Sequence, residues 1–410
     1  MFFSYYNIVL QENLDTVVLF SSQTGAICEV EREVYDLYVN NRTSIGDTFP
    51  YLNEFLELGF VTPADDLFET ESISQDTLTM ILSLSERCNL SCYYCFEKRN
   101  SASAVTEKEL SDSLLTVLEK ETEINPDIRS VKVVWFGGEP LLKKDSITRL
   151  SSLFISACEK KGIEYESSII TNGTLIADDF INGMDRCCIR HVQITVDGGL
   201  DAFIKNKQGN ELLWSKLYKA LCLLHDKCDV TLRINLDKRN MNSIKLFLSK
   251  LSQDNILDSF GITIARIDTD NPELSLTYRE YCKKKLEIVN YLFDNLHYNN
   301  DDSLFKELIP IDRACAIMDY GAVVVDSNGF CHKCEDSVGK SSRISVSDVE
   351  GCINLINQSH ITIKDTCQSC SMFPLCRGGC PIHWNMLNCE SKQKYIKDLA
   401  LLKYKLCVNG

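Results

Sequence analysis

The stretch TMILSLSERCNLSCYYC, residues 79–95, decides the fold of this chain. Its first part, Thr79 to Leu84, is an apolar run of the length that forms a buried strand. Its second part places Cys88, Cys92 and Cys95 on one short loop directly after that strand. Thiolate is the usual ligand of iron-sulfur centres, so three thiols within eight residues can hold one cluster. The loop has no fourth cysteine, which would leave one iron of a cubane free to chelate the amino and carboxylate groups of a small molecule.

Strand and helix patterns alternate after this loop. Further candidate strands cover residues 130–136, 167–171, 191–196, 230–235 and 261–264, with helical segments such as Glu107 to Lys120 and Leu212 to His225 between them. This alternation predicts an α/β fold with a parallel sheet, and six units suit a partial or complete barrel. Active sites of such barrels lie at the carboxyl ends of the strands.

Short polar motifs stand at the ends of the later candidate strands. They contribute Gly137, Gly138 and Glu139 in FGGEP, Asn172 in ITNG, Asp197 in QITVDG, and Arg233 and Asn235 in LRIN. The glycines would let the backbone approach a ligand, and the guanidinium could pair with a carboxylate. A TNG or DG alone is more often a turn. Their order at successive strand ends predicts one common site.

The spacing C-x-x-x-C-x-x-C, with Tyr94 before the last cysteine, resembles the signature of the radical S-adenosylmethionine (SAM) superfamily, and the resemblance covers about residues 78–300. It implies a partial (β/α)6 barrel and a [4Fe-4S] cluster on the three cysteines. It also implies SAM binding by Tyr94, the GGE segment, Asn172, Arg233 and Asn235, with GGE holding the methionine amino group. Reductive cleavage of SAM in that superfamily gives a 5′-deoxyadenosyl radical that abstracts a substrate hydrogen. A zinc or structural thiol cluster is the alternative.

The chain becomes rich in cysteine and loops from about Asp312. Seven cysteines follow in a spaced pattern: Cys315, Cys334, Cys367, Cys370, Cys376, Cys380 and Cys389. This pattern resembles the SPASM domain, which binds two auxiliary [4Fe-4S] clusters. The resemblance assigns Cys367, Cys370, Cys376 and Cys389 to an outer cluster, and Cys315, Cys334 and Cys380 to an inner one. A zinc ribbon is the alternative for the C-x-x-C-like pairs.

The inner set has only three members. Its fourth ligand would be Cys331, Cys282 or a substrate thiolate, and the sequence does not choose among them. An open iron would favour carbon-sulfur bond formation, because the metal would deprotonate and hold the attacking thiol. The other cysteines are expected to be buried thiols that pack as small hydrophobic side chains.

The first 75 residues form a separate acidic module. We expect strands at Tyr6 to Leu10 and Thr16 to Phe20, and helices at Glu31 to Tyr38 and Tyr51 to Leu58, the second ending at Gly59. The module has 13 acidic and 2 basic side chains, a net of −11 out of −15 for the chain. Its pattern resembles the recognition element of enzymes that modify ribosomally synthesised peptides, a PqqD-like winged-helix module to which a leader peptide adds as a strand. The charge then predicts a Lys/Arg-rich leader; a solvated acidic face is the alternative.

Composition limits the other partners. The 410 residues include 20 cysteines, and we find neither a signal-peptide pattern nor a run of about 20 apolar residues. We therefore expect a cytoplasmic protein with reduced thiols. The net charge of −15 disfavours nucleic acid and membrane surfaces as partners. A flavodoxin- or ferredoxin-type reductant and a monomer are expected.

These resemblances predict domains at 1–75 (leader binding), 76–305 (radical SAM core) and 306–410 (SPASM), in an enzyme that modifies a ribosomal precursor peptide. A thioether cross-link is the favoured product, since an auxiliary cluster can accept the second electron. Other cross-links and epimerisation rank lower. Anaerobic sulfatase maturases are an alternative, but they lack the front module. They also carry Asp directly after the cysteine that corresponds to Cys334, whereas this chain has Glu335 there. The non-enzymatic alternative is an iron-sulfur electron carrier. Asp197, Glu335 and Asp237 are the candidates for a general base.

Overall fold

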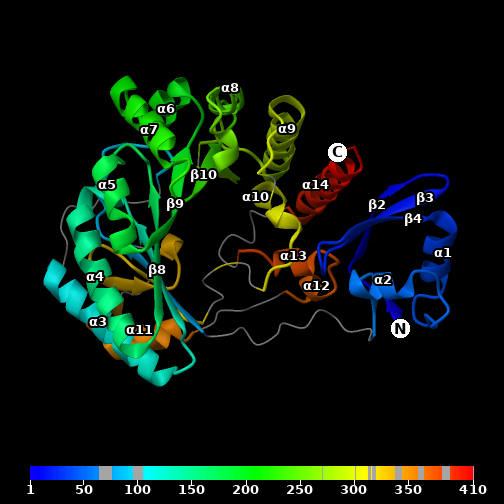
Figure 1. The fold of residues 1–410 in the computed structure, drawn as a ribbon, viewed down its shortest axis with the longest axis horizontal. Coiled ribbons are helices and arrows are strands. Elements are labelled where there is room, and N and C mark those ends of the chain that lie inside the picture. The colour runs from blue at the N-terminus through cyan, green and yellow to red at the C-terminus, as the bar shows by residue number, and fades with distance from the viewer. Residues whose placement is uncertain are drawn as a thin grey trace.

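The computed structural model describes residues 1–63, 76–95, 105–269, 271–300, 302–312, 315, 320–337, 344–358, 364–380 and 388–409. Its main sheet has the strand order β11-β10-β9-β8-β7-β6-β12-β13-β14 (Figure 1). The six strands after the N-terminal module are β6 (Thr77–Ser83), β7 (Ser130–Phe136), β8 (Glu164–Thr171), β9 (Ile189–Val196), β10 (Asp229–Leu236) and β11 (Phe260–Arg266). All neighbouring pairs among them are parallel. The predicted α/β fold with a parallel sheet is therefore confirmed.

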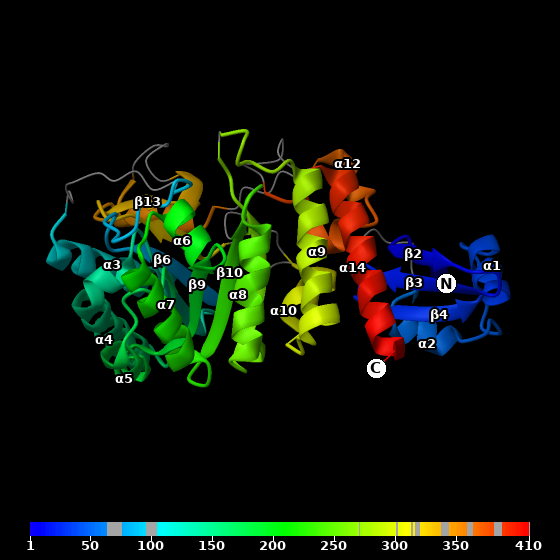
Figure 2. The ribbon, with the colours of Figure 1, turned by 90° about the horizontal axis from the view of Figure 1, so that it is seen from above.

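Helices connect these strands and cover one face of the sheet (Figure 2). They are α3 (Glu107–Ile124), α4 (Lys144–Lys161), α5 (Asp178–Gly183), α6 (Leu200–Lys207), α7 (Glu211–Leu224), α8 (Met241–Gln253), α9 (Tyr278–Leu296) and α10 (Asp302–Phe305). On β7, Val131, Val133 and Trp135 are fully buried, whereas the alternate residue Lys132 is exposed. Side chains alternate between the faces of a strand, so the other face of the sheet stays more open.

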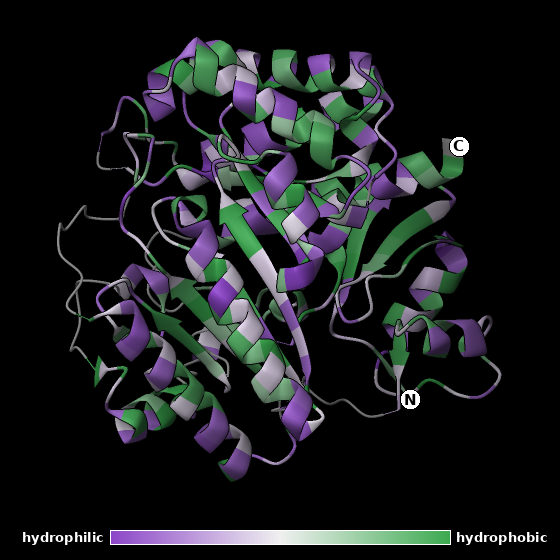
Figure 3. Cartoon of the chain, turned by 60° about the vertical axis from the view of Figure 1, so that its left-hand side comes forward, coloured by the Kyte–Doolittle hydropathy of each residue, from purple (hydrophilic) through white to green (hydrophobic). Residues whose placement is uncertain are grey.

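The helices are amphipathic and have clear starting signals. Hydrophilic and hydrophobic residues both occur along the helices visible in Figure 3. Helix α3 begins at a capping box, in which Thr106 Oγ1 accepts a bond from Glu109 N (3.2 Å) and the Glu109 carboxylate accepts one from Thr106 N (2.8 Å). Such caps satisfy backbone donors that the helix itself leaves free.

The region after residue 312 adds strands to the same sheet. Strand β12 (Ala322–Val325) is parallel to β6, and β13 (Phe330–His332) and β14 (Ile344–Ser345) continue in antiparallel order. The four residues of β12 are buried, so its apolar run AVVV extends the sheet core. Sequence reasoning expected mainly loops here and missed this strand. The helices of this region are α11 (Val349–Ile356), α12 (Asp365–Gln368), α13 (Phe373–Cys376) and α14 (Cys389–Asn409).

The N-terminal module has a sheet and a core of its own. Its elements are β1 (Phe2–Phe3), β2 (Asn7–Glu12), β3 (Thr16–Ser21), β4 (Ile27–Glu31), α1 (Arg32–Asn40), α2 (Leu52–Glu57) and β5 (Val61–Thr62). The three-stranded sheet has the order β2-β3-β4, and sequence reasoning missed β4. Val17 and Leu19 face the module core, while Ile8 and Phe20 join the main core. Helix α14 contacts β2 and β4 and lies beside α9 (Figures 1 and 2).

Within the described ranges, no helix combines the length and the apolar character needed to span a bilayer.

Candidate active site

The loop after β6 brings three thiols into one neighbourhood. Cys88 and Cys92 are half-buried and Cys95 is exposed. The sulfur of Cys88 accepts bonds from the amide of Leu90 (3.4 Å) and from Asn172 Nδ2 (3.6 Å). Burial raises the pKa of the Cys92 thiol, and the charges of Cys95 and Cys88 raise it further. The charges of the three sulfurs thus influence one another, and N–H donors point at one of them; as placed, the three thiols do not meet closely enough to hold a metal ion, so their role as cluster ligands stays a prediction.

Two other segments hold this loop in place. The amides of Ser91 and Tyr93 donate to the carbonyls of Lys207 (3.0 Å) and Asn206 (3.0 Å) at the end of α6. On the other side, Gly138 N donates to Ser85 O (2.8 Å) and Glu139 N to Arg87 O (2.9 Å). The loop is therefore fixed by backbone bonds before and within its cysteine run.

The two glycines of FGGEP are required for this close approach. Gly137 has a φ of +115°, and a Cβ there would lie 2.5 Å from Ser83 Oγ. A Cβ on Gly138 would lie 2.4 Å from the carbonyl oxygen of Arg87. The sequence suggested that these glycines approach a ligand; in the structure they approach the loop that carries the cysteines.

The carboxylate of Glu139 is buried and bonded to protein. It accepts bonds from Leu141 N (3.0 Å), Thr171 Oγ1 (2.7 Å) and Asn172 N (2.9 Å). Burial raises the pKa of this carboxyl, and these hydrogen bonds counteract the rise. Glu139 thereby joins the FGGEP segment to the end of β8 and places Asn172 beside Cys88.

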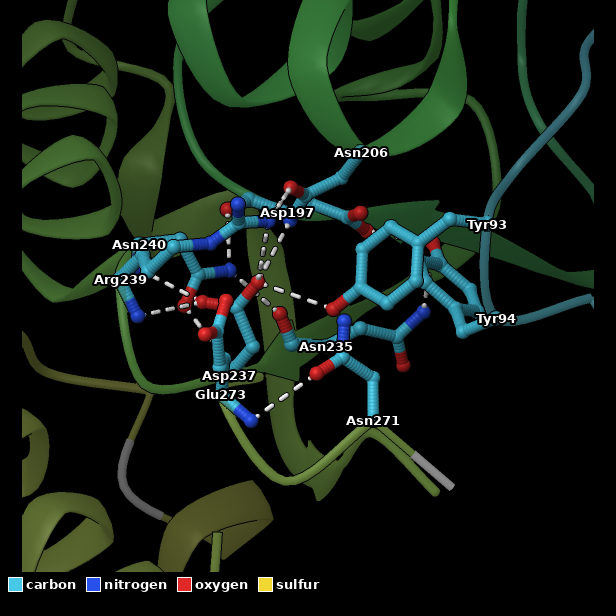
Figure 4. A network of polar contacts seen from close by, with 10 residues as sticks. All are labelled: Tyr93, Tyr94, Asp197, Asn206, Asn235, Asp237, Arg239, Asn240, Asn271 and Glu273. Carbon is cyan, nitrogen blue, oxygen red and sulfur yellow. Dashed lines mark hydrogen bonds and ion pairs between the residues drawn. The ribbon is translucent and has the colours of Figure 1, made fainter. Parts of the chain in front are cut away.

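A polar cluster lies at the ends of β9 and β10 (Figure 4). The hydroxyl of Tyr94 donates to Asp197 Oδ1 (2.7 Å) and accepts a bond from Asn235 Nδ2 (3.1 Å). The ammonium of Lys207 lies 3.7 Å from the same Asp197 oxygen. Asp197 Oδ2 is buried and has no hydrogen-bond partner in the described part of the chain. Burial raises the pKa of Asp197, and Lys207 is the largest opposing influence.

Asp237 differs from Asp197 because both of its oxygens are bonded. Its Oδ1 accepts from the amides of Arg239 (2.6 Å) and Asn240 (2.9 Å), and its Oδ2 accepts from Tyr93 Oη (3.0 Å) and Asn206 Nδ2 (3.3 Å). Figure 4 shows Asp237 enclosed by these partners. This arrangement indicates a structural carboxylate that orients Tyr93.

Arg233 lies at the exposed margin of this cluster, and Glu335 lies outside it. Arg233 is exposed, and its Nε donates to Asn235 Oδ1 over 3.4 Å. Glu335 is half-buried in the 3₁₀ helix η6 (Glu335–Ser337), next to Cys334. Of the predicted SAM contacts and bases, the structure thus groups Tyr94, Asp197 and Asn235 in one network, and Glu139 and Asn172 in another beside Cys88.

The predicted outer cluster set converges around α12 and α13. Burial raises the pKa of the Cys367 thiol, and the charges of Cys376, Cys389 and Cys370 raise it further. The side chain of Gln393 on α14 points its amide at Cys370 Sγ (3.6 Å). These four thiols therefore lie near one another.

Of the three cysteines predicted for the inner cluster, two influence each other. Burial raises the pKa of Cys334 to about 11, and Cys315 is among the charges that raise it further. Cys380 follows Gly378 and Gly379, both with positive φ, at the end of a described segment. Across the described residues, no three Cys, His, Asp or Glu side chains are arranged closely enough to hold a metal ion. The structure shows which thiols are neighbours, and the ligand sets stay a prediction.

The two protein candidates for the fourth inner ligand have other neighbours. Cys331 Sγ lies 2.7 Å from Cys352 Sγ, and both residues are buried between β13 and α11. Cys282 is buried on α9, where burial raises the pKa of its thiol to about 11; the charge of Lys285 lowers that pKa and the charge of Glu307 raises it.

Sequence reasoning missed Lys207 and Asn206. Both lie on α6, which follows the VDG motif, and both are buried. A signal was present, because Lys207 stands four residues after Phe203 and so falls on the apolar face of that helix. A lysine on such a face requires a buried partner.

Comparison with known proteins agrees with this geometry. Residues 82–251 match the Radical SAM superfamily. The chain is 22% identical to the radical SAM cyclopropyl synthase TigE of Paramaledivibacter caminithermalis, over 92% of this chain and 88% of that protein. It is 21% identical to the serine-type anaerobic sulfatase-maturating enzyme of Klebsiella pneumoniae, over 76% and 84% of the two chains.

Solved structures show the same fold. Native anSMEcpe with bound AdoMet matches with a TM-score of 0.61 and 17% identity, over 81% of this chain and 99% of that one. SuiB of Streptococcus suis bound to the precursor peptide SuiA matches with a TM-score of 0.51 and 14% identity, over 92% and 95%. Residues 82–251 thus match the Radical SAM superfamily, and the chain is similar in sequence to the cyclopropyl synthase and the sulfatase-maturating enzyme and in fold to anSMEcpe and SuiB.

Proposed function

We propose that this enzyme forms an intramolecular cross-link in a ribosomally synthesised precursor peptide. The observation that carries the proposal is the loop of three neighbouring thiols after β6, held between the end of α6 and the FGGEP segment. Cys88, Cys92 and Cys95 would hold a [4Fe-4S] cluster and leave one iron for SAM. With both groups bound, the site supplies a 5′-deoxyadenosyl radical that abstracts a hydrogen atom from the peptide.

The residues of the chain would orient SAM and the substrate around that iron. The unbonded Oδ2 of Asp197 is a buried acceptor, which is costly unless a ligand donor fills it. A hydroxyl or ammonium of the cofactor or substrate would fit this atom. Tyr94 and Asn235 fix the orientation of Asp197, and Asn172 positions Cys88. Arg233 is exposed and Glu335 is half-buried, so either residue would contact substrate or cofactor from the solvent-facing side of the site.

The N-terminal module would bind the leader of the substrate peptide. In the described residues, β2 and β4 each pair only with β3, so both edges of that sheet are unpaired. Glu29 and Glu31 on β4 and Glu33 after it are exposed; the Glu29 carboxylate also accepts a hydrogen bond from Tyr404 on α14, and the charge of these residues would favour a basic peptide. Main-chain bonds to an edge strand would give affinity, and these carboxylates would give specificity. SuiB, with a similar fold, is a protein solved with its precursor peptide.

The cysteine-rich segment would hold two auxiliary [4Fe-4S] clusters. The charges of Cys376, Cys389 and Cys370 raise the pKa of Cys367, which supports the outer one, and the charge of Cys315 raises the pKa of Cys334, which supports part of the inner one. Cross-linking removes two electrons in all, so an acceptor for the second electron is needed, and an auxiliary cluster would provide it. A flavodoxin- or ferredoxin-type donor would supply the first electron.

A thioether is our preferred bond. Cys331 faces Cys352 and Cys282 packs on α9, which favours a substrate thiolate over either residue as the fourth inner ligand. A cross-link between two carbon atoms ranks second, and the similarity to a cyclopropyl synthase supports it.

Mass spectrometry of the precursor peptide, co-expressed anaerobically with the enzyme, tests the proposal. A cross-link lowers the peptide mass by two hydrogens, and blocking free thiols before analysis shows whether a cysteine is consumed. Loss of product in Cys92→Ala is expected. An unchanged mass with altered stereochemistry would show an epimerase, and cofactor cleavage without any peptide product would contradict the assignment.

Sulfatase maturation is the second candidate, supported by the similarity to the Klebsiella pneumoniae enzyme. Incubation with a sulfatase peptide that carries Cys or Ser distinguishes the two, because a maturase would oxidise that one residue. An electron carrier would release no 5′-deoxyadenosine when reduced protein is mixed with SAM alone. Iron and zinc analysis of the anaerobic protein tests the cluster itself.

A further inference from the structure

Lys207 is a buried cation at the centre of the site. Its side chain is 2% exposed, and its Nζ lies 3.7 Å from Asp197 Oδ1 and 5.9 Å from the centre of the Tyr94 ring. Its backbone carbonyl accepts a bond from Ser91, inside the cysteine loop. The lysine is thus held by both its backbone and its side chain against the segment that carries the three thiols.

The side chain of Lys207 lies beside the thiol loop. Its ammonium is 5.9 Å from the centre of the ring of Tyr94, which directly precedes Cys95, and its backbone carbonyl is bonded to Ser91, which directly precedes Cys92. The buried carboxylate of Asp197 is bonded to the same Tyr94. One buried positive charge and one buried negative charge therefore lie next to the segment that carries the three thiols.

We propose that Lys207 is a positioning residue that raises the reduction potential of the cluster on Cys88, Cys92 and Cys95, because its buried ammonium stabilises the added negative charge. The inference rests on the proposed function, since it requires that cluster. Reduction adds one electron from a low-potential one-electron donor, and it forms and breaks no covalent bond. The proposed effect is electrostatic and involves no proton transfer by Lys207.

Burial is what makes the effect large. Two charges interact several times more strongly in the protein interior than in water. Lys205, two residues earlier on the same helix, is exposed, so solvent and salt screen its charge. Lys205→Met is therefore a matched control, because it removes the same charge from the same helix at an exposed position.

Redox titration followed by electron paramagnetic resonance tests the inference on anaerobically reconstituted protein without SAM. The variants are Lys207→Met, Lys207→Arg, Asp197→Asn and the control Lys205→Met. We expect Lys207→Met to lower the potential, Asp197→Asn to raise it, and Lys207→Arg and Lys205→Met to remain close to wild type. A tenfold change in the reduction equilibrium corresponds to 59 mV for one electron, and we expect at least that for Lys207→Met.

The outcomes separate the inference from the proposed function. If wild-type protein forms no cluster signal at this loop, the proposed function fails. If the signal is present but Lys207→Met keeps the wild-type potential while SAM binds more weakly, Lys207 serves the cofactor and the inference is overturned. If Lys207→Met does not retain iron, the test depends on Asp197→Asn, for which we expect a higher reduction potential. An unchanged potential in Asp197→Asn would also overturn the inference.

Discussion

At the scale of single residues, the two buried aspartates at the site differ in how their oxygens are used. Asp237 accepts four bonds from protein donors, whereas Asp197 has one oxygen without a partner in the described residues. A buried carboxylate with satisfied oxygens stabilises the fold, and one with a free oxygen is suited to receive a ligand. Their chemistry is identical, so the difference arises from their neighbours.

We therefore expect different results from two isosteric substitutions. Asp237→Asn turns an acceptor into a donor that faces the Asn206 amide or backbone N–H groups, and should cost about 1–3 kcal/mol of stability with little effect on SAM binding. Asp197→Asn keeps the acceptor for Tyr94 but leaves the buried Lys207 ammonium without its partner charge, so it should lower stability as well and, unlike Asp237→Asn, weaken SAM binding. Differential scanning calorimetry without SAM and isothermal titration calorimetry with SAM measure the two effects. Equal SAM affinity in both variants would contradict the distinction.

At the scale of elements, the FGGEP segment and the thiol loop depend on glycine. Gly138→Ala places a methyl group 2.4 Å from the carbonyl oxygen of Arg87, which is a backbone atom and cannot rotate out of the way. We expect a cost of about 1–3 kcal/mol and a lower iron content after reconstitution. Gly183→Ala on α5 is the control, because a Cβ there meets nothing within 4 Å. Normal iron content in Gly138→Ala would show that the two segments are not tightly coupled.

A second element-scale contact joins α9, α14 and the 3₁₀ helix η4 (Lys306–Leu308). Lys285 pairs with Glu307, and Tyr395 Oη donates to the same Glu307 oxygen over 3.1 Å. Burial acts to raise the pKa of Glu307, but the charge of Lys285 and the bonds from Lys285 and Tyr395 outweigh it and lower the pKa. The pair therefore stabilises the fold above the ordinary glutamate pKa of about 4.3. That contribution is lost as the pH falls through the lower folded-state pKa.

Glu307→Gln tests this contact. Removing one partner of a buried pair costs about 3–5 kcal/mol, but the Glu307 side chain is 41% exposed and solvent screens it. We therefore expect a loss of about 1–2 kcal/mol at pH 7. Thermal unfolding at pH 7 and below pH 4 measures it, and the gap between variant and wild type should narrow in acid. A stability difference between variant and wild type that grows in acid would contradict the stabilising role of the Lys285–Glu307 pair.

At the scale of the whole molecule, the charge distribution is uneven, because the first 75 residues hold a net −11 of the −15. Like charges on one module attract a basic peptide and raise its rate of association. Exposed charges are screened within about 10 Å at 0.1 M salt, so this contribution should depend strongly on ionic strength.

We expect the double variant Glu29→Lys/Glu31→Lys to weaken binding of the precursor peptide about tenfold at low salt, since each exposed pair contributes about 0.2–1 kcal/mol. Glu57→Lys, exposed on α2 of the same module, is the control for charge alone. Fluorescence anisotropy with the labelled peptide and the full-length enzyme measures both. Equal weakening by the control would indicate a diffuse charge effect, and no weakening by the double variant would exclude β4 as the docking edge.

By itself, the sequence determined the parallel α/β sheet and the thiol loop, because both depend on local patterns. Strand and helix periodicity and cysteine spacing are properties of neighbouring residues. The tertiary structure alone decided the rest. It paired β12 with β6, placed Lys207 beside Asp197, and turned Cys331 toward Cys352. These contacts join residues that are not neighbours along the chain, and whether a buried carboxylate is satisfied or free depends on which donors the fold brings to it.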